Sequence, residues 1–307
     1  MKKILMSLAL LLSVLFYFWT PNLDVHQLEA NYAKPPSQFM NVLGSRMHVR
    51  DTGPKQAPAL ILIHGFGASL HTWDEWSSTL DKEYRVIRFD LPGFGLTGPD
   101  STGDYTDDRT NALLLELMRQ LQIEQATLIG NSIGGRIAWY FTSQHPAQVN
   151  KLVLISPDGF KSPNGNYGQQ PEISSLMYLI QFTMPKFLLK QNLEIAYANP
   201  ATLTPSMLDQ YYELLLAPGV RQAMMQRMQQ RVLKDPKPFL QSIQQPTLLL
   251  WGEQDRMIPV ENAQDYLSLL PHAELQTLKN TGHLPQEENP AHHLRGLLEF
   301  LKSPKLY

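Results

Sequence analysis

One serine of this chain stands in a setting that could make it a nucleophile. Ser132 lies between Gly130 and Gly134 in the run Gly-Asn-Ser-Ile-Gly-Gly, after an apolar stretch and before a helical pattern. Small neighbours permit a strained strand-to-helix turn, which lifts the hydroxyl clear of a sheet and places it at a helix N-terminus. The pattern predicts attack on a carbonyl carbon. The alternative is a glycine-rich turn with a bystander serine.

A serine hydroxyl needs a base, and His283 is the histidine best placed to be one. It lies in a loop after the last expected strand, where that loop would meet the carboxyl end of a sheet. The base in turn needs a carboxylate that orients it and stabilises the imidazolium. Asp255 follows a buried apolar run and is our candidate, with Asp158 as the alternative. We therefore expect Ser132, Asp255 and His283 to form a catalytic triad.

The oxyanion of a tetrahedral intermediate needs backbone N–H donors. The run His64-Gly65-Phe66-Gly67 follows an apolar stretch, and its glycines let the main chain turn toward the serine. We expect the N–H groups of Phe66 and Ile133 to form this oxyanion hole. We interpret His64 as a residue that braces the turn rather than as a second base.

These residues must be positioned by alternating strands and helices. Short apolar runs predict strands at 59–63, 84–89, 126–129, 152–155, 247–251 and 273–278, and helical patterns occupy 73–80, 106–121, 133–145, 260–270 and 290–301. Strands that alternate with helices indicate an α/β fold, with a mostly parallel sheet covered by helices on both faces. We expect this core to comprise residues 41–158 and 246–303.

Residues 159–245 interrupt the alternation. This stretch contains no clear buried strand, but it has helical patterns, such as 173–182 and 207–216, that prolines separate. We expect it to be a helical insertion between two strands of the sheet.

The first 20 residues have the layout of an export signal. Two lysines precede the apolar run Ile4–Trp19, whose 16 residues would span roughly 24 Å as a helix. Aromatic residues end the run, and no small-residue cleavage site follows it. We favour an uncleaved signal-anchor over a cleaved signal peptide, with residues 21–40 as a linker. The rest of the chain would then be extracytoplasmic and tethered to a membrane, or secreted if the signal is removed.

Composition excludes several other classes of function. The 307 residues carry a formal net charge of −2, so nothing attracts the chain as a whole to nucleic acid. There is no cysteine, which removes thiolate chemistry and disulfides. Gly93–Gly98 matches a dinucleotide-binding pattern, but Pro99 follows it instead of a helix. His292 and His293 are adjacent on a helix and point apart, so we expect neither a cofactor nor a metal.

Five motifs together resemble the α/β-hydrolase superfamily over about residues 40 to 302. They are HGFG at 64–67, DLPGFG at 90–95, GNSIGG at 130–135, WGEQD at 251–255 and GH at 282–283. The resemblance implies the nucleophile, acid and base already named, the same two oxyanion donors, and a helical cap over residues 159–245. It points to the capped lipase and esterase-like branch and to the carbon–carbon bond hydrolases of aromatic ring-cleavage pathways.

Two departures separate the chain from the carbon–carbon hydrolases. Its oxyanion loop has fewer glycines, and Leu284 stands where many of them carry tryptophan. With the export signal, this favours cleavage of a carboxylic ester, from a small molecule or a lipid, through an acyl-enzyme. Carbon–carbon bond hydrolysis of a diketone acid is the alternative within enzymes. A non-catalytic binding protein on the same fold is the alternative outside them.

Overall fold

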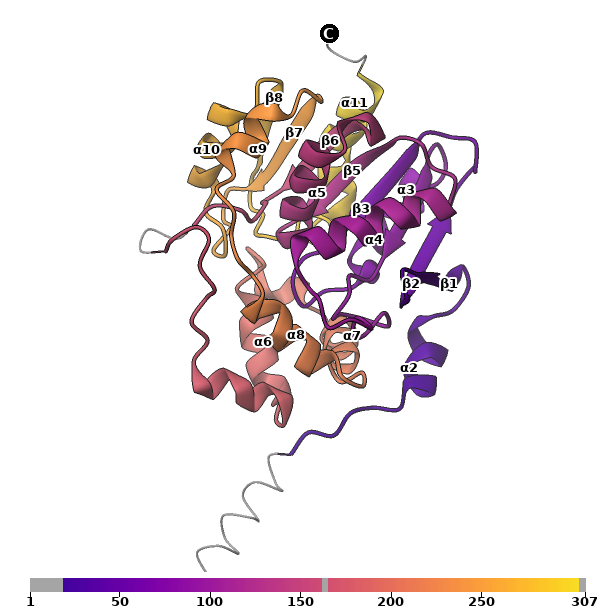
Figure 1. Ribbon diagram of the computed structural model, residues 1–307, viewed down its shortest axis with the longest axis vertical. Coiled ribbons are helices and arrows are strands. Elements are labelled where there is room, and N and C mark those ends of the chain that lie inside the picture. The colour runs from indigo at the N-terminus through magenta and orange to yellow at the C-terminus, as the bar shows by residue number, and fades with distance from the viewer. Residues whose placement is uncertain (1–18, 162–164, 304–307) are drawn as a thin grey trace, which may run out of the picture.

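The centre of the molecule is an eight-stranded sheet with the strand order β1-β2-β4-β3-β5-β6-β7-β8 (Figure 1). The computed structural model describes residues 19–161 and 165–303. Strands β3 to β8 are mutually parallel and include all six strands predicted from the apolar runs. The eight strands are β1 (Ser37–Val42), β2 (Ser45–Thr52), β3 (Ala59–Ile63), β4 (Arg85–Phe89), β5 (Ala126–Asn131), β6 (Val149–Ile155), β7 (Thr247–Gly252) and β8 (Ala273–Leu278).

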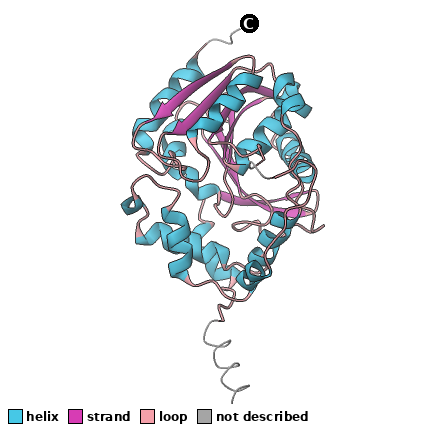
Figure 2. Ribbon diagram, turned by 90° about the vertical axis from the view of Figure 1, so that its left-hand side faces the viewer, coloured by secondary structure: helices cyan, strands magenta, loops and turns pink. Residues whose placement is uncertain are grey.

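Helices cover both faces of this sheet (Figure 2). Successive side chains of a strand point to opposite faces, so Ile61 and Ile63 of β3 join one apolar cluster while Leu60 and Leu62 join the other. The first cluster includes residues of α4 (Asp107–Gln120), α5 (Ile133–Gln144) and α10 (Ala263–Leu269), and the second includes residues of α3 (Asp74–Leu80) and α11 (Pro290–Lys302). The predicted fold, an α/β sheet buried on both faces, is confirmed.

The strands β1 and β2 form an antiparallel hairpin that the apolar runs did not predict. Its turn places Leu43 at φ 48° and Gly44 at φ 86°, the left-handed conformations that a tight two-residue hairpin turn requires. β2 pairs antiparallel with β4 and so extends the parallel sheet. A prediction based on apolar runs misses the hairpin because β2 contains polar residues even at buried positions. One of them is His48, whose Nδ1 donates to Asp90 at 2.8 Å.

Residues 21–40, which we expected to be a linker, hold regular structure. Helix α2 (Val25–Tyr32) begins after Asp24, whose side chain accepts a hydrogen bond from the Gln27 N–H at 3.0 Å. Leu28 is fully buried in the core, and β1 begins at Ser37. The polar composition misled the prediction, since a short helix can be fixed to a core by one buried side chain.

The insertion between β6 and β7 is helical, as predicted, and all of its helices except the last lie below the sheet in Figure 1. It contains the 3₁₀ segments η3 (Ser175–Gln181) and η4 (Pro200–Thr202) and the helices α6 (Lys186–Glu194), α7 (Pro205–Leu215), α8 (Val220–Gln229) and α9 (Lys237–Ser242). The last of these packs on the core, because Phe239 contacts Tyr140 of α5 with ring centroids 5.2 Å apart. We call residues 175–231, from η3 to the two residues that follow α8, the cap. Three further 3₁₀ turns complete the described elements: η1 (Leu70–Trp73), η2 (Pro146–Gln148) and η5 (Val260–Asn262).

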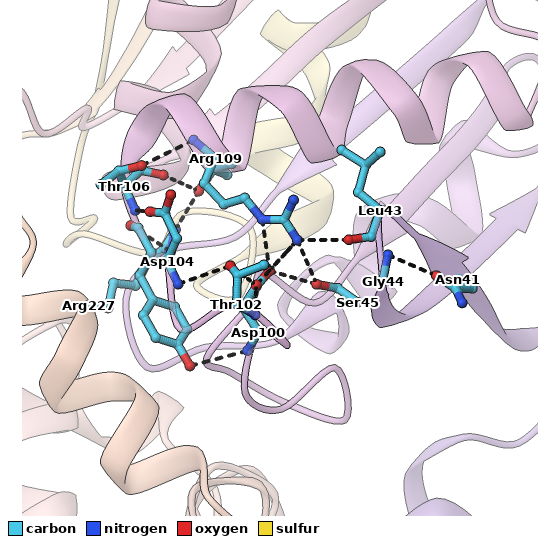
Figure 3. Close-up of polar contacts among 12 residues, drawn as sticks. Asn41, Leu43, Gly44, Ser45, Asp100, Thr102, Asp104, Thr106, Arg109 and Arg227 are labelled. Atoms are coloured by element: carbon cyan, nitrogen blue, oxygen red, sulfur yellow. Dashed lines mark hydrogen bonds and ion pairs between the residues drawn. The ribbon is translucent and has the colours of Figure 1, made fainter.

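The loop before α4 ties the hairpin, the core and the cap together (Figure 3). Asp100 is buried and accepts hydrogen bonds from the Ser45 hydroxyl at 2.6 Å and from the Arg109 guanidinium at 3.1 Å. Arg109 also donates to the Leu43 carbonyl at 3.0 Å. On the cap side, Gln230 accepts from the Tyr105 N–H at 2.7 Å.

Within residues 19–161 and 165–303, no helix is long and apolar enough to cross a membrane. The signal-anchor that we expect over residues 1–20 lies outside this part of the chain except for its last two residues.

Candidate active site

Ser132 occupies the turn between β5 and α5 in a strained backbone conformation. Its φ of 56° and ψ of −121° are sparsely populated by residues with a side chain and cost roughly 1–3 kcal/mol. The turn is possible because its neighbours lack side chains. A Cβ on Gly130 would lie 2.2 Å from the Gly134 carbonyl oxygen, and one on Gly134 would lie 2.2 Å from the Ile63 carbonyl oxygen. Ser132 itself is partly exposed.

Asp255 and His283 form the hydrogen-bonded pair that the sequence predicted. The Nδ1 of His283 donates to Oδ2 of Asp255 at 2.7 Å, and both residues are buried. The other carboxylate oxygen accepts from the backbone N–H groups of Met257 at 2.8 Å and Ile258 at 2.9 Å, which fixes its orientation. Burial works to raise the pKa of Asp255, but the hydrogen bond and the attraction of His283 outweigh it and lower the pKa. An ionised Asp255 therefore holds the tautomer of His283 that leaves Nε2 free to accept a proton.

Two contacts bring the serine turn, the histidine loop and the expected oxyanion loop together. Asn131 donates through Nδ2 to the His283 carbonyl at 3.0 Å, which holds the residue before the serine against the histidine loop. On the other side, a Cβ on Gly65 would lie 3.3 Å from the Cβ of Ser132. The three loops thus meet around Ser132, at the carboxyl ends of β3, β5 and β8.

The two expected oxyanion donors stand on two of these loops. Phe66 follows Gly65, and its half-exposed ring packs on Phe94 with centroids 5.1 Å apart. Ile133 is the first residue of α5, where backbone N–H groups have no partner within the helix. Their action on an oxyanion stays a prediction.

His64 has the bracing role that its sequence context indicated. Its Nδ1 donates to the Gly65 carbonyl at 2.7 Å, and its Nε2 accepts from the Leu91 N–H at 2.9 Å. Complete burial lowers its pKa to about 4, although the nearby Asp90 carboxylate acts in the opposite direction. His64 is neutral at pH 7 and both of its ring nitrogens are used within the fold.

Asp158, the alternative acid, is bound to two arginines. Arg136 donates to it at 3.1 Å and Arg231 of the cap at 2.7 Å. Burial favours the neutral acid, but the two guanidinium groups outweigh it and lower the pKa of this carboxyl. Its contacts join the core to the cap and leave Asp255 as the carboxylate beside His283.

Two carboxylates near the site were missed by sequence reasoning. Glu288 accepts from the backbone N–H groups of Gly282 at 2.7 Å and Asn199 at 2.9 Å, so it holds the histidine loop to the cap. Glu287 is partly buried and accepts from the hydroxyls of Tyr211 at 2.7 Å and Tyr197 at 2.5 Å. Its remaining donor is the Thr72 hydroxyl. A pair of acidic residues four and five positions after the histidine was the available signal.

Burial raises the pKa of Glu287, and the three hydroxyl donors only partly oppose this. Glu287 and Tyr211 line a small pocket between the cap and the core, together with Gly67, Ala68, Ser69, Thr72, Gln210 and Leu214. This pocket begins one residue after Phe66, so it adjoins the expected oxyanion loop.

The other sequence patterns have structural roles. Gly93–Gly98 closes on itself, with the Gly93 N–H donating to the Gly98 carbonyl at 2.7 Å. His293 is buried and its Nδ1 donates to the Pro285 carbonyl at 3.1 Å, while the neighbouring His292 is exposed. Among the described residues, no group of three or more histidine, aspartate or glutamate side chains is arranged to bind a metal.

Known proteins resemble this chain over most of its length. The family model described as alpha/beta hydrolase fold matches residues 58–290. A 2-hydroxy-6-oxononadienedioate/2-hydroxy-6-oxononatrienedioate hydrolase of Burkholderia vietnamiensis is 28% identical over 280 residues, which are 87% of this chain and 96% of the relative.

Two solved structures show the range of neighbours. A membrane phospholipase A, described as a bacterial virulence factor, is 25% identical with a TM-score of 0.71, over 99% of this chain and 100% of the other. The 2-hydroxy-6-oxo-6-phenylhexa-2,4-dienoate hydrolase of Rhodococcus sp. strain RHA1 is 23% identical with a TM-score of 0.76, over 87% of this chain and 98% of the other.

Proposed function

The chain belongs to the alpha/beta hydrolase fold family, and we propose that it is a serine hydrolase that cleaves carboxylic esters through an acyl-enzyme. The observation that carries the proposal is the 2.7 Å contact between His283 and the buried Asp255, with Ser132 held on a strained turn against the histidine loop. A serine that must be activated by an oriented base needs this arrangement.

In the proposed reaction, the Oγ of Ser132 attacks the ester carbonyl carbon while Nε2 of His283 takes the hydroxyl proton. The carbonyl oxygen becomes an oxyanion, which the N–H groups of Phe66 and Ile133 stabilise. His283 then gives the proton to the departing alkoxide, and an alcohol leaves. Water attacks the acyl-enzyme by the same route, releases a carboxylic acid and restores Ser132. Asp255 stays ionised and stabilises the imidazolium.

Two observations support an ester as the substrate. The likeness to a membrane phospholipase A extends over nearly the whole of both chains, including the region before the sheet. Leu284, directly after the base, is buried in an apolar group with Tyr197 and Leu203 of the cap. The histidine loop is therefore held to the cap by an apolar contact, at the position where many carbon–carbon hydrolases carry tryptophan.

Carbon–carbon bond hydrolysis is the second candidate, and the curated relatives favour it more directly. Several of them, from Burkholderia, Cupriavidus and Escherichia coli, carry the same 2-hydroxy-6-oxononadienedioate hydrolase name. Such a substrate carries carboxylates, so this candidate requires a cationic or hydrogen-bonding group over Ser132 that an ester with an apolar chain does not need.

One comparison of substrates separates the two candidates. Purified protein is assayed on p-nitrophenyl esters from acetate to palmitate, on a phospholipid, and on a 2-hydroxy-6-oxo-dienoate. We expect turnover of esters that is lost in Ser132→Ala. Turnover of the dienoate at a kcat/KM about a hundredfold or more above that of any ester would reject the ester proposal and establish the second candidate.

We also propose that the catalytic domain is extracytoplasmic and tethered to a membrane by its N-terminal segment. The support is the apolar run Ile4–Trp19 after two lysines. Mass spectrometry of the protein isolated from its native membrane tests this. A mature chain that begins after Trp19 would replace the anchored form with a secreted one.

A further inference from the structure

We propose that the outer face of the cap is a membrane-contact surface that rests on a lipid bilayer. We call it the apolar cap face and define it by Trp19, Leu176, Leu179, Phe182, Phe187, Leu188 and Ile195, all of which are exposed. The proposed delivery of a lipid substrate to the active site rests on the proposed ester hydrolysis. The contact itself is inferred from the surface.

The first part of this face is a row along η3. Side chains three positions apart eclipse one another in a 3₁₀-helix. Leu176, Leu179 and the C-terminal Phe182 follow this spacing, and Leu176 is 71% exposed. No residue of η3 is buried, so packing against the cap does not account for the row. A large apolar row facing water is typical of a binding surface.

The second part lies on α6, which follows η3 after three residues. Phe187 is 62% exposed, and Leu188 and Ile195 are seven positions apart, two turns along one side of the helix. Helix α6 also has no buried residue. Residues 173–193 contain no aspartate or glutamate and have Lys186 and Lys190 as their only charges. Lys186 is paired with Asp209 and Lys190 with Glu194 at 3.5 Å, so the attraction of this helix to a bilayer comes from its apolar side chains.

The N-terminal residues of the described chain end on this same face. The ring of Trp19 lies 6.1 Å from that of Phe182, and the Thr20 N–H donates to the Phe182 carbonyl at 2.9 Å. The Thr20 hydroxyl accepts from the Met184 N–H at 3.0 Å. Figure 1 shows the described chain beginning below the cap, on the side of the molecule away from α11. The described chain therefore begins at the apolar cap face, and the sequence before Trp19 is apolar.

This continuity favours a bilayer over the other possible occupants. Residues 4–18 cannot cover the face and remain in water, because they are apolar except for Ser7 and Ser13 and would expose an equal apolar surface themselves. A bilayer accommodates both surfaces at once. The exposed indole of Trp19 at their junction suits the level of the lipid headgroups.

The contact would bring the active site to the lipid. Helix α6 leads directly to Ala196, whose carbonyl accepts from the His283 N–H at 2.6 Å. Tyr197 beside it donates to Glu287 at the wall of the pocket. One short segment thus joins the apolar cap face to the catalytic histidine, so an acyl chain leaving the bilayer has a short way to Ser132.

The test uses the full chain in vesicles. The sequence has no cysteine, so one introduced cysteine is a unique attachment point for an environment-sensitive fluorophore. Leu179→Cys and Phe187→Cys report on the apolar cap face, and the exposed Glu299→Cys on α11 is the matched control. The labelled proteins are reconstituted in phosphatidylcholine–phosphatidylglycerol vesicles with and without lipids that carry a nitroxide near the headgroup. Flotation measures the vesicle-bound fraction.

We expect the nitroxide lipids to quench the probes at 179 and 187 several-fold more than the probe at 299. Equal quenching at all three positions in protein that floats with the vesicles would overturn the contact. A blue shift without lipid quenching would also overturn it, because a second copy or residues 1–18 would then cover the face. Protein that does not float overturns both the contact and the anchor.

A second variant links the contact to catalysis. Leu179→Glu with Phe187→Glu should lower hydrolysis of a vesicle-embedded ester about tenfold and leave a soluble short-chain ester unchanged, because charged side chains resist insertion among lipids. Unchanged hydrolysis of the vesicle ester would contradict the delivery of substrate. If the wild-type protein hydrolyses no ester, the proposed function fails, and the quenching measurement still decides the contact.

Discussion

Ser132 shows how a single residue depends on the absence of side chains around it. Its positive φ is tolerated because Gly130, Gly134 and Gly65 allow strand, helix and neighbouring loop to approach within distances that a Cβ would block. The strain holds the hydroxyl in one place, which would reduce the reorganisation that the proposed reaction requires. The position of Ser132 on a strained turn could therefore be predicted from the glycines around it in the sequence.

The Ser132→Ala variant should lose ester turnover by roughly 10⁴-fold or more and keep its stability. The reason is that the variant removes only a partly exposed hydroxyl from a turn whose backbone is set by the glycines. Intact-mass measurement after treatment with a fluorophosphonate checks the assignment directly. Labelling of the alanine variant as strong as that of the wild type would reject Ser132 as the nucleophile.

The two candidate acids should respond differently to the same substitution. Asp255→Asn should lower kcat by several orders of magnitude, because an amide at 2.7 Å from Nδ1 favours the wrong histidine tautomer. Asp158→Asn should leave kcat nearly unchanged and lower the free energy of unfolding, since Arg231 loses its charged partner and Arg136 loses one of two, keeping Asp107. Kinetics and urea unfolding of both variants give the comparison. A reversed result in kcat would place the acid at 158.

The role of a residue could be predicted from the sequence only where the residue lies within a recognisable motif. Asp255 and His283 follow predicted strands in a recognisable order, so their pairing could be predicted from the sequence. Glu287 and Asn131 were not, because their roles depend on contacts with Tyr211 and with the His283 carbonyl that lie far away in the sequence. No local pattern specifies such partners.

At the scale of elements, the apolar strands were predictable and the polar ones were not. The strand β3 is buried at every position, so its sequence is continuously apolar. The hairpin of β1 and β2 lies at the edge of the sheet, with charged side chains such as Arg46 facing outward. The polar helix α2 was misjudged for the same reason, since the burial of Leu28 rather than an apolar periodicity fixes it.

The contacts of Asp100 in the loop before α4 should contribute strongly to the free energy of unfolding. Arg109→Met should lower the free energy of unfolding by about 3 kcal/mol, because the Asp100 carboxylate is fully buried and loses its cation. Arg119→Met on the same helix is the matched control. Its pair with Glu116 leaves 73% of the arginine side chain exposed, so water and salt screen the pair and the cost should be small. Equal midpoints in urea for the two variants would contradict the importance of this loop.

The contact of Glu287 with the cap should make stability depend on pH. The folded-state pKa lies above the unfolded value of 4.5, so the folded protein binds more protons between the two values. Stability should therefore fall as the pH rises from about 4.5 through the raised pKa. Glu287→Gln should flatten this part of the curve, while the exposed Glu124→Gln should not. Thermal unfolding midpoints from pH 4.5 to 8 provide the measurement, and parallel curves for wild type and Glu287→Gln would contradict the prediction.

At the scale of the whole molecule, the cap is joined to the core from several directions. Arg231 reaches Asp158, Gln230 reaches the loop before α4, and Tyr197 and Tyr211 reach Glu287. These bonds surround the site, and the N-terminal residues add one more attachment on the outer side of the cap. The sequence predicted the cap as an insertion, but its attachments come from side chains that no periodic pattern marks.

The N-terminal attachment predicts where the chain can be shortened. Arg221 of α8 is buried, and its guanidinium donates to the Thr20 carbonyl at 2.7 Å and to the Asn22 side chain at 2.9 Å. A chain that begins at Trp19 keeps both acceptors and should unfold at the same urea concentration as the full chain. A chain that begins at Leu23 leaves a buried cation without them and should lose about 1–3 kcal/mol of unfolding free energy.

Both shortened chains should keep the activity of the full chain on soluble short-chain esters in the absence of denaturant, because Ser132, Asp255 and His283 make no contact with residues 19–22. The full chain with Arg221→Met provides the control, since it removes the same bonds from the other partner. Beginning the Arg221→Met chain at Leu23 should then cost little more, because the two changes remove one interaction. Additive losses in that combined variant would show that residues 19–22 stabilise the cap through other contacts, and the role assigned to Arg221 would be wrong.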